Sequence, residues 1–210
     1  MPEHIVRQGD TTTSIAQEHG FFWETIWDHP NNEELKSSRE NPNVLHPGDV
    51  IFIPERRERQ ESGATEQRHR FRRKGVPERL RLRLLDEDDE PRADISYSLE
   101  IDGNLFTGTT DSEGMIEHSI PPNAGTGRLL VGDSQEEEHE LNLGHLDPIS
   151  EISGVQARLK NLNLYLGEVN GEMNDETGLA IMEFQQRHDL EETGEMNDET
   201  RGQLEEVHGS

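Results

Sequence analysis

The sequence predicts an α+β protein made of several small modules, and three observations support this fold class. The first is length, because 210 residues exceed one small domain and suit two or three. The second is composition, because only 29% of the residues are hydrophobic, which favours several small cores over one large core. The third is a change of pattern along the chain, from mixed strand and helix signals, through alternating strand signals, to helical spacing.

Residues 1–54 are predicted to form the first module, in the order strand, helix, helix, strand. The segment HIVRQGD indicates a short strand that ends at a Gly-Asp turn, and TTTSIAQEHG indicates a helix that ends at Gly20. Helical sequence follows from ETIWDHP through NNEELKSSR, and VIFIP closes the module as a strand. The opening HIVRQGDTTTSIA and the closing NVLHPGDVIFIP resemble the LysM module, a βααβ fold that binds glycans containing N-acetylglucosamine.

The LysM resemblance implies a shallow sugar groove between the loop after the first strand and the loop before the last. Short hydroxyls and backbone amides there would meet the polar groups of the sugar, and apolar residues would receive its methyl group. Two features depart from the family pattern: Thr12 stands where a large apolar residue is usual, and the segment FFWETIWDHPNNEELKSSRENP is long. A LysM fold retained only for docking is therefore an open alternative. The implied contacts are Gly9, Asp10, Thr11 and Thr12, facing Asn43, Val44 and Leu45.

Residues 55–79 are predicted to be a basic, flexible linker. Of the 20 Lys and Arg residues, 11 lie between Arg56 and Arg83, whereas the whole chain has a formal net charge of −25. Such an acidic body disfavours nucleic acid and anionic lipid as partners. The basic stretch has one aromatic residue, Phe71, and so lacks the repeated stacking pattern that single-stranded RNA needs. A solvated linker is therefore favoured over a nucleic-acid-binding segment.

Residues 80–149 are predicted to form a small antiparallel β-sandwich. LRLRLL alternates, and DISYSLEIDG places Ile95, Tyr97, Leu99 and Ile101 on one face. TGRLLV and HELNL follow, with turn signals such as EIDGN, TTDSEGM and PPNAGTG between the strands. The segment GTTDSEGMIEHSIP resembles a turn of transthyretin-like and carboxypeptidase-regulatory domains, which implies a noncatalytic spacer or adhesive module. DEDDE and DSEG lack the spacing of a calcium loop, so acidic surface turns are favoured there.

Residues 150–210 are predicted to form a bundle of three helices. SGVQARLKNLNLYLG begins with a Ser cap and spaces Val155, Leu159, Leu162 and Leu166 at helical intervals. NDETGLAIMEFQQRHDL gives a second helix, with Leu179, Phe184 and either Ile181 or Met182 toward the core, and NDETRGQLEEVHG gives a third.

The heptapeptide GEMNDET occurs twice, at 171–177 and 194–200. In each copy the glycine makes a turn, and the asparagine, Asn174 or Asn197, is an N-cap candidate. The Asp-Glu pair then lies in the first helical turn, at the positive end of the helix dipole. The methionine before each cap is expected to enter the core. The repeat is therefore interpreted as one structural joint built twice.

The segment VQARLKNLNLYLGEVNGEMNDETGLAIMEFQQRHDLEETGEMNDET resembles the peptidoglycan-binding-domain-1 family, a three-helix bundle. The positions that match are its spaced Val-Gln, Leu, Gly, Asn-Gly, Thr, Ala, Phe-Gln and Thr-Gly residues. The resemblance assigns Gln156 and Phe184 to the core and its support. It places any glycan contact in the loop 167–174, which contains Asn170, and on the polar face near Gln185.

No catalytic site is predicted. The chain has no cysteine, which excludes disulfides, thiolate metal sites and cysteine nucleophiles. It contains neither His-Glu-x-x-His nor Gly-x-Ser-x-Gly. Its ten histidines are scattered singly, so solvated or capping histidines are favoured over a zinc site assembled in space. We therefore expect no enzymatic activity, no metal and no cofactor.

The predicted function is noncatalytic binding of peptidoglycan or another N-acetylglucosamine glycan, with two wall-directed modules on one chain. The N-terminus has no basic and apolar leader, and no apolar run approaches membrane-spanning length, so synthesis in the cytoplasm without a signal peptide is expected.

The long LysM form and the join LGHLDPISEISGVQARLKNLNL resemble accessory proteins encoded beside type VI secretion and other contractile-injection spikes. This resemblance implies a spike or baseplate protein as partner, and delivery through the injection apparatus to the periplasm, the cell wall or the outside. The alternative is a structural adaptor or effector-loading protein of the spike or baseplate that has lost glycan binding.

Overall fold

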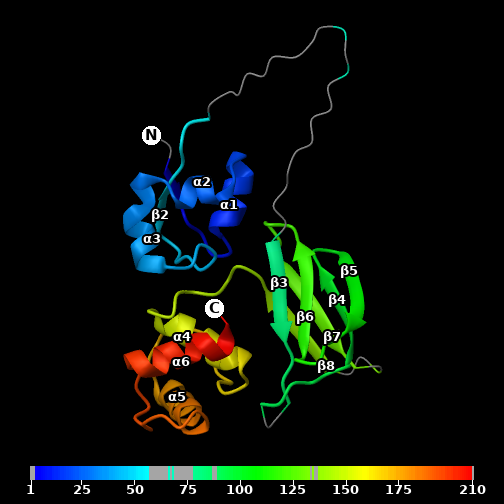
Figure 1. Ribbon diagram of the computed structural model, residues 1–210. Coiled ribbons are helices and arrows are strands. Elements are labelled where there is room, and N and C mark those ends of the chain that lie inside the picture. Colours follow the sequence, from blue (N-terminus) through cyan, green and yellow to red (C-terminus); the bar gives the residue numbers. More distant parts are fainter. Residues whose placement is uncertain are drawn as a thin grey trace.

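The computed structural model has three modules along the chain (Figure 1), and its described residues form three separate hydrophobic cores. The first lies in an N-terminal module of helices and a two-stranded sheet, the second in a β-sandwich, and the third in a C-terminal helical module. Most of the predicted basic linker lies outside the described residues. The structure describes residues 3–56, 66, 68, 78–86, 89–132, 134 and 137–209.

The N-terminal module has the predicted order of strand, helices and strand. Its two strands pair antiparallel, with His4 opposite Ile51. The helical stretch is divided, because a 3-10 turn that begins at Pro30 separates the second α-helix from the third. The elements are β1 (Glu3–Ile5), α1 (Thr12–His19), α2 (Trp23–Trp27), η1 (Pro30–Asn32), α3 (Glu33–Arg39) and β2 (Val50–Phe52).

A buried asparagine ties the helices of this module to its sheet. Asn32 is 1% exposed, and its Nδ2 donates to the carbonyl oxygens of Ile26 (2.8 Å) and Phe52 (3.0 Å). Its Oδ1 accepts a hydrogen bond from the backbone N–H of Phe52 (2.7 Å). Both ends of the amide are therefore satisfied, as a buried polar group requires. The surrounding core consists of Val6, Ile15, Ala16, Ile26, Trp27, Leu45, Ile51 and Ile53.

The middle of the chain forms the predicted antiparallel β-sandwich. One sheet has the strand order β3-β6 and the other β5-β4-β7-β8. Leu99 and Ile101 are fully buried between the sheets, and Ile95 and Tyr97 pack against the same core, which confirms the predicted apolar face. The strands are β3 (Glu78–Arg83), β4 (Ser96–Ile101), β5 (Asn104–Thr109), β6 (Met115–Ile120), β7 (Thr126–Val131) and β8 (Glu137–Asn142).

The C-terminal module consists of three helices, α4 (Ile152–Asn161), α5 (Asp175–Arg187) and α6 (Asp198–His208). The first helix begins earlier than predicted, after Glu151, so Ser153 does not cap it. The Ser153 hydroxyl instead donates to the carboxylate of Asp147 (2.6 Å). No helix in the described part of the chain is long and apolar enough to cross a membrane.

The second and third helices begin as predicted. The Oδ1 of Asn174 accepts a hydrogen bond from the N–H of Thr177, and that of Asn197 accepts one from Thr200, each at 2.8 Å. The Asp-Glu pairs occupy the first turns. The two methionines differ, because Met196 packs against the core whereas Met173 is exposed.

The apolar pattern of the C-terminal module was partly misjudged. On α5 the buried stripe is Thr177, Ala180, Ile181, Phe184 and Gln185, which includes two polar residues. Leu179 and Met182 therefore fall on the other face and are exposed, and Leu166, beyond the end of α4, is 86% exposed. The prediction selected the most hydrophobic residues, whereas the helix buries the positions that lie on one face, whether apolar or polar.

A buried arginine joins α4 to the chain that precedes it. Arg158 is 1% exposed and donates to the carbonyl oxygens of Asp147 and Gly154, both at 2.9 Å. Burial lowers the pKa of Arg158 to about 10, although Glu205 and Asp147 act in the opposite direction. Burial also lowers the pKa of His208 to about 4, and Arg158 adds to this effect. At pH 7 the arginine is therefore charged and the histidine neutral.

Two glycines of the C-terminal module should respond oppositely to substitution by alanine. A Cβ on Gly154 would overlap the carbonyl oxygen of Pro148, whereas a Cβ on Gly202 meets nothing within 4 Å. We expect Gly154→Ala to destabilise the module by about 1–3 kcal/mol through overpacking. Gly202→Ala should stabilise it by about 0.5–1 kcal/mol, because glycine is a poor helix former.

Hydrogen exchange of peptides from residues 150–208, followed by mass spectrometry, measures this stability within the full chain. A shift of protection in the same direction for both variants would contradict the described packing.

Candidate functional site

The two loops that the sequence predicts to form a sugar groove lie side by side. Loop 1, residues 6–11, follows β1, and loop 2, residues 40–49, precedes β2. The backbone N–H of Thr12 donates to the carbonyl oxygen of Pro42 (3.0 Å). This bond joins the start of α1, directly after loop 1, to the beginning of loop 2, so the two loops lie close together there.

Loop 1 is held by its own side chains. The N–H of Asp10 donates to the carbonyl oxygen of Arg7 (3.0 Å), and the N–H of Arg7 donates to the Asp10 carboxylate (2.9 Å). Gly9 lies between them with φ of +91°, a conformation that favours glycine. Thr11 is the N-cap of α1 and forms a reciprocal capping box with Ser14. The Thr11 hydroxyl is therefore committed to the helix.

Loop 2 contacts both α1 and the sandwich through one side chain. The Oδ1 of Asn43 accepts a hydrogen bond from the hydroxyl of Thr13 (2.9 Å). The Nδ2 of Asn43 donates to the carboxylate of Glu78, the first residue of β3 (3.2 Å). The side chain that was predicted to meet a glycan thus has both of its polar atoms engaged in this conformation.

A paired carboxylate fixes the end of loop 2. Arg39 donates two hydrogen bonds to Asp49, each of 2.8 Å, and the N–H of His46 donates a third (2.9 Å). Burial by itself raises the pKa of Asp49, but the hydrogen bonds from Arg39 and His46 outweigh it and hold the pKa below its ordinary value. Asp49 therefore has a structural role, in setting the position from which β2 begins.

The predicted groove residues divide by exposure. Those with buried side chains face the interior of the module and can form only the floor of a site. The others are partly exposed and form its accessible edge. The first set is Thr12, Val44 and Leu45, and the second is Gly9, Asp10, Thr11 and Asn43.

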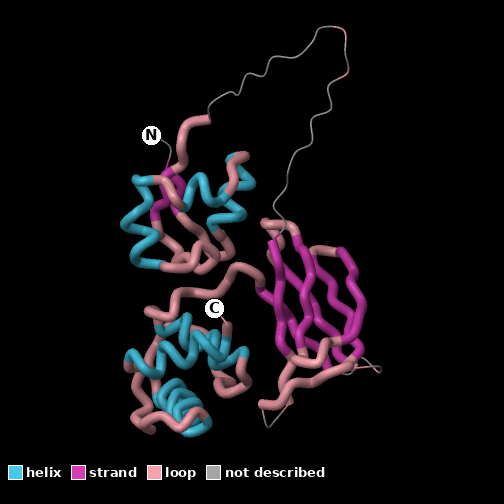
Figure 2. Tube along the Cα trace, in the orientation of Figure 1, coloured by secondary structure: helices cyan, strands magenta, loops and turns pink. Residues whose placement is uncertain are grey.

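The segment that joins the sandwich to the C-terminal module, residues 143–148, lies against loop 1 (Figure 2). We call it the connector. The side chain of Gln8 donates to the carbonyl oxygen of His145 (3.1 Å). A Cβ on Gly9 would lie 3.2 Å from Nε2 of His145, and one on Gly144 would lie 2.6 Å from the Gly9 carbonyl oxygen. A ligand at the loop 1 edge would therefore meet the connector as well.

In the C-terminal module, a buried glutamine holds the first GEMNDET loop. Gln156 is fully buried, and its Nε2 donates to Oδ1 of Asn170 (3.1 Å), the carbonyl oxygen of Glu172 (3.0 Å) and the hydroxyl of Thr177 (3.0 Å). Its Oε1 accepts hydrogen bonds from the N–H groups of Asn170 (3.0 Å) and Gly171 (2.9 Å). One side chain therefore fixes the whole turn.

Gln185 repeats this arrangement around the second GEMNDET loop. Its Nε2 donates to Thr193 Oγ1 (3.1 Å), Glu195 O (3.0 Å) and Thr200 Oγ1 (3.0 Å). Its Oε1 accepts from the N–H groups of Thr193 and Gly194, both at 2.9 Å. Gln185 was predicted as a glycan contact on a polar face, whereas the structure buries it completely. Its amide is used inside the module, which leaves no surface group for a glycan.

The two glutamines were not recognised as equivalent because their loops differ in length. Gln156 lies 15 residues before Gly171, whereas Gln185 lies 9 residues before Gly194. Both glutamines directly follow a buried core residue, Val155 or Phe184, on the helix that precedes a GEMNDET copy. This shared position is the signal that could have identified both.

The accessible part of this module that overlaps the predicted loop 167–174 is the loop at 166–173. Asn170 is exposed there, although its Oδ1 accepts hydrogen bonds from Gln156 and from the N–H of Glu172. Three apolar side chains of the same loop are exposed, namely Leu166, Val169 and Met173. Apolar surface beside exposed polar groups is suited to the faces of a sugar or to peptide side chains.

Comparisons with known families agree with the resemblances at both ends of the chain. Residues 4–54 match the LysM domain, and residues 150–204 match the family described as "Putative peptidoglycan binding domain". Searches of curated proteins and of solved structures found no match. The two family matches support peptidoglycan binding, whereas the transthyretin-like resemblance of the sandwich stays a prediction.

Removing one buried glutamine should destabilise the C-terminal module strongly. Gln185→Ala leaves the buried N–H of Gly194 and the partly buried N–H of Thr193 without their acceptor, so we expect a loss of about 2–4 kcal/mol. Gln186→Ala is a matched control, because Gln186 is the exposed neighbour on the same helix and should change stability by less than about 0.5 kcal/mol. Hydrogen exchange of α5 and α6 measures both effects. Equal protection in the two variants would disprove the role of Gln185.

Proposed function

We propose that this chain is a noncatalytic peptidoglycan-binding protein that contacts the wall with both of its terminal modules. The observation that carries the proposal is the pair of family matches, one at each end. Each matched segment has its own closed core, so each can present a binding surface independently. Two sites on one chain raise the overall affinity through linkage, without any additional contact.

The surfaces proposed for this role are the partly exposed loop edges in the N-terminal module and the loop 166–173 in the C-terminal module. Neither surface supplies a cluster of cationic side chains, and the chain carries a net charge of −25. Binding should therefore depend on hydrogen bonds and apolar contacts more than on charge, and should tolerate salt.

Both matched families are binding domains, which supports a noncatalytic role. The interior of the sandwich is occupied by its own apolar side chains, including Leu99, Ile101, Ile116 and Leu129. We propose that this module acts as a spacer between the two wall-directed ends.

Co-sedimentation of the full chain with purified peptidoglycan tests the proposal. We expect the protein to pellet at both low and high salt. Asn43→Ala at the loop 2 edge and Val169→Asp in the exposed loop should each weaken binding several-fold. The double variant should lose far more than either single variant, because linked binding depends on both sites.

Matched controls are Asn31→Ala and Leu105→Asp, which change exposed residues of the same types away from the proposed surfaces. Retention of the protein in the supernatant at every salt concentration would refute glycan binding. Loss of binding in the controls would show that the proposed surfaces are not the ones used.

We further propose that the chain associates with a spike or baseplate component of a contractile injection system and is delivered with it to the periplasm, the wall or the outside. The support is the resemblance of the long LysM form and of the join before α4 to accessory proteins encoded beside such spikes. The four-stranded sheet also ends in β5, an edge strand on which Leu105 is 67% exposed. Exposed edges commonly dock partners by strand addition.

Co-expression with a spike or baseplate protein of a contractile injection system, from the genome that encodes this chain, followed by affinity purification, tests the association. We expect a stable complex that Leu105→Asp weakens several-fold, whereas Val169→Asp leaves it intact. Absence of a complex with the unchanged chain would refute this association and would leave the peptidoglycan proposal unaffected.

A further inference from the structure

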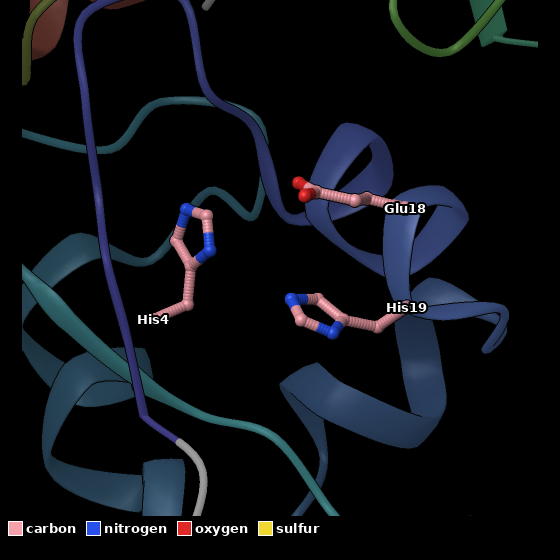
Figure 3. A group of neighbouring side chains, drawn as sticks. All are labelled: His4, Glu18 and His19. Atoms are coloured by element: carbon pink, nitrogen blue, oxygen red, sulfur yellow. The ribbon is translucent and has the colours of Figure 1, made fainter.

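Two histidines and a glutamate meet where β1 passes the last turn of α1. His4 belongs to β1, and Glu18 and His19 are consecutive residues of α1. Each offers one metal-ligating atom, and the three atoms lie within 4.8 Å of one another. Figure 3 shows the two imidazole rings and the carboxylate directed toward a common space. Neither family match assigns a role to this cluster.

The imidazole of His19 has a buried nitrogen with no partner among the described residues. Its Nε2 is inaccessible to solvent and makes no hydrogen bond. The ring lies edge-on to that of His4, with centroids 5.9 Å apart and an interplanar angle of 86°. Buried polar atoms are almost always satisfied in native proteins, so this nitrogen requires an explanation.

His4 is held in the orientation that a metal ligand needs. Its Nε2 and the Oδ2 of Asp10 are 2.9 Å apart, and the same carboxylate accepts a hydrogen bond from the N–H of Arg7. Nδ1 is therefore the nitrogen of His4 that is left to bind an ion. A carboxylate bonded to the second nitrogen is the usual partner of a metal-ligating histidine, because it fixes the tautomer and raises the basicity of the ligand.

An ion can reach the cluster from solvent. Glu18 and Asp10 line an open cleft of about 390 Å³ between α1 and the turn after β6. The other residues of this cleft, Ser14, Gln17 and Asn123, are polar. Glu18 is exposed, so its side chain can move toward the two imidazoles.

We propose that His4, His19 and Glu18 bind a divalent transition-metal ion, Zn²⁺ by preference, with Asp10 as the positioning residue behind His4. Two imidazoles and one carboxylate form a donor set typical of zinc sites with three protein ligands and a fourth position open to water. Nitrogen donors do not suit Mg²⁺ or Ca²⁺, which take oxygen ligands.

The required rearrangement is small. Ligand atoms at about 2.0–2.2 Å from a tetrahedral zinc ion lie about 3.3–3.6 Å from one another. The separations of up to 4.8 Å must therefore shorten by up to about 1.2–1.5 Å, and the exposed Glu18 side chain can supply most of this movement.

Metal titration of the full chain tests the site. After removal of metal with a chelator, isothermal titration with ZnCl₂ should show one saturable site with a dissociation constant in the micromolar range or tighter, and MgCl₂ and CaCl₂ should show none. Glu18→Gln and His19→Ala should each raise the dissociation constant at least about tenfold. Asp10→Asn should raise the dissociation constant by about 10–100-fold, because it weakens the hydrogen bond that orients the ligand His4.

Matched controls separate this site from the other histidines and acids. His46→Ala and Glu24→Gln change residues of the same module outside the cluster and should leave zinc affinity unchanged. Loading with Co²⁺ gives a second readout, because its visible absorption reports nitrogen ligation and should disappear in His19→Ala.

Two results would overturn the proposal. One is the absence of saturable zinc binding by the unchanged chain. The other is equal affinity in the unchanged chain and in Glu18→Gln and His19→Ala, which would place the ion elsewhere. Circular dichroism checks the folding of each variant, and Glu18→Gln keeps the test decisive because it changes only an exposed side chain.

Discussion

Each of the three small cores depends on a buried polar side chain that hydrogen-bonds to the backbone of a neighbouring segment. Asn32 joins α2 to β2, and Gln156 and Gln185 hold the turns before α5 and α6. In the sandwich, the buried hydroxyl of Thr110 donates to Arg92 O and accepts from Ile95 N. A chain that is 29% hydrophobic has little apolar surface to bury, so such bonds determine how its loops close.

The parts of the fold that sequence analysis predicted depend on local physics. Strand alternation placed Leu99 and Ile101 on one buried face, and the capping chemistry of Asn174 and Asn197 located the starts of two helices. These signals act within a few residues, so they do not depend on the rest of the chain. The proximity of loops 1 and 2 required the LysM resemblance, because no local pattern relates Thr12 to Pro42.

The features that were missed arise from distant segments. Gln185 is polar and was placed near the surface, yet the loop after α5 folds over it and satisfies its amide. The spacing of His4 and His19 in the sequence matches no metal-binding motif. Only the packing of β1 beside α1 brings their rings together. Asp10 was predicted as a glycan contact, and the structure additionally shows it bonded to His4, a relation between two side chains that composition does not reveal.

The contact between loop 1 and the connector has a consequence for the order in which the molecule assembles. The bond from Gln8 to His145 spans 137 residues. The modules on either side of it have closed cores of their own, so the bond contributes to their docking and not to the stability of either core. A hydrogen bond contributes only about 0.5–1.5 kcal/mol net, so this docking is weak compared with any of the three cores. It should form last and open first, which frees the loop 1 edge without unfolding a module.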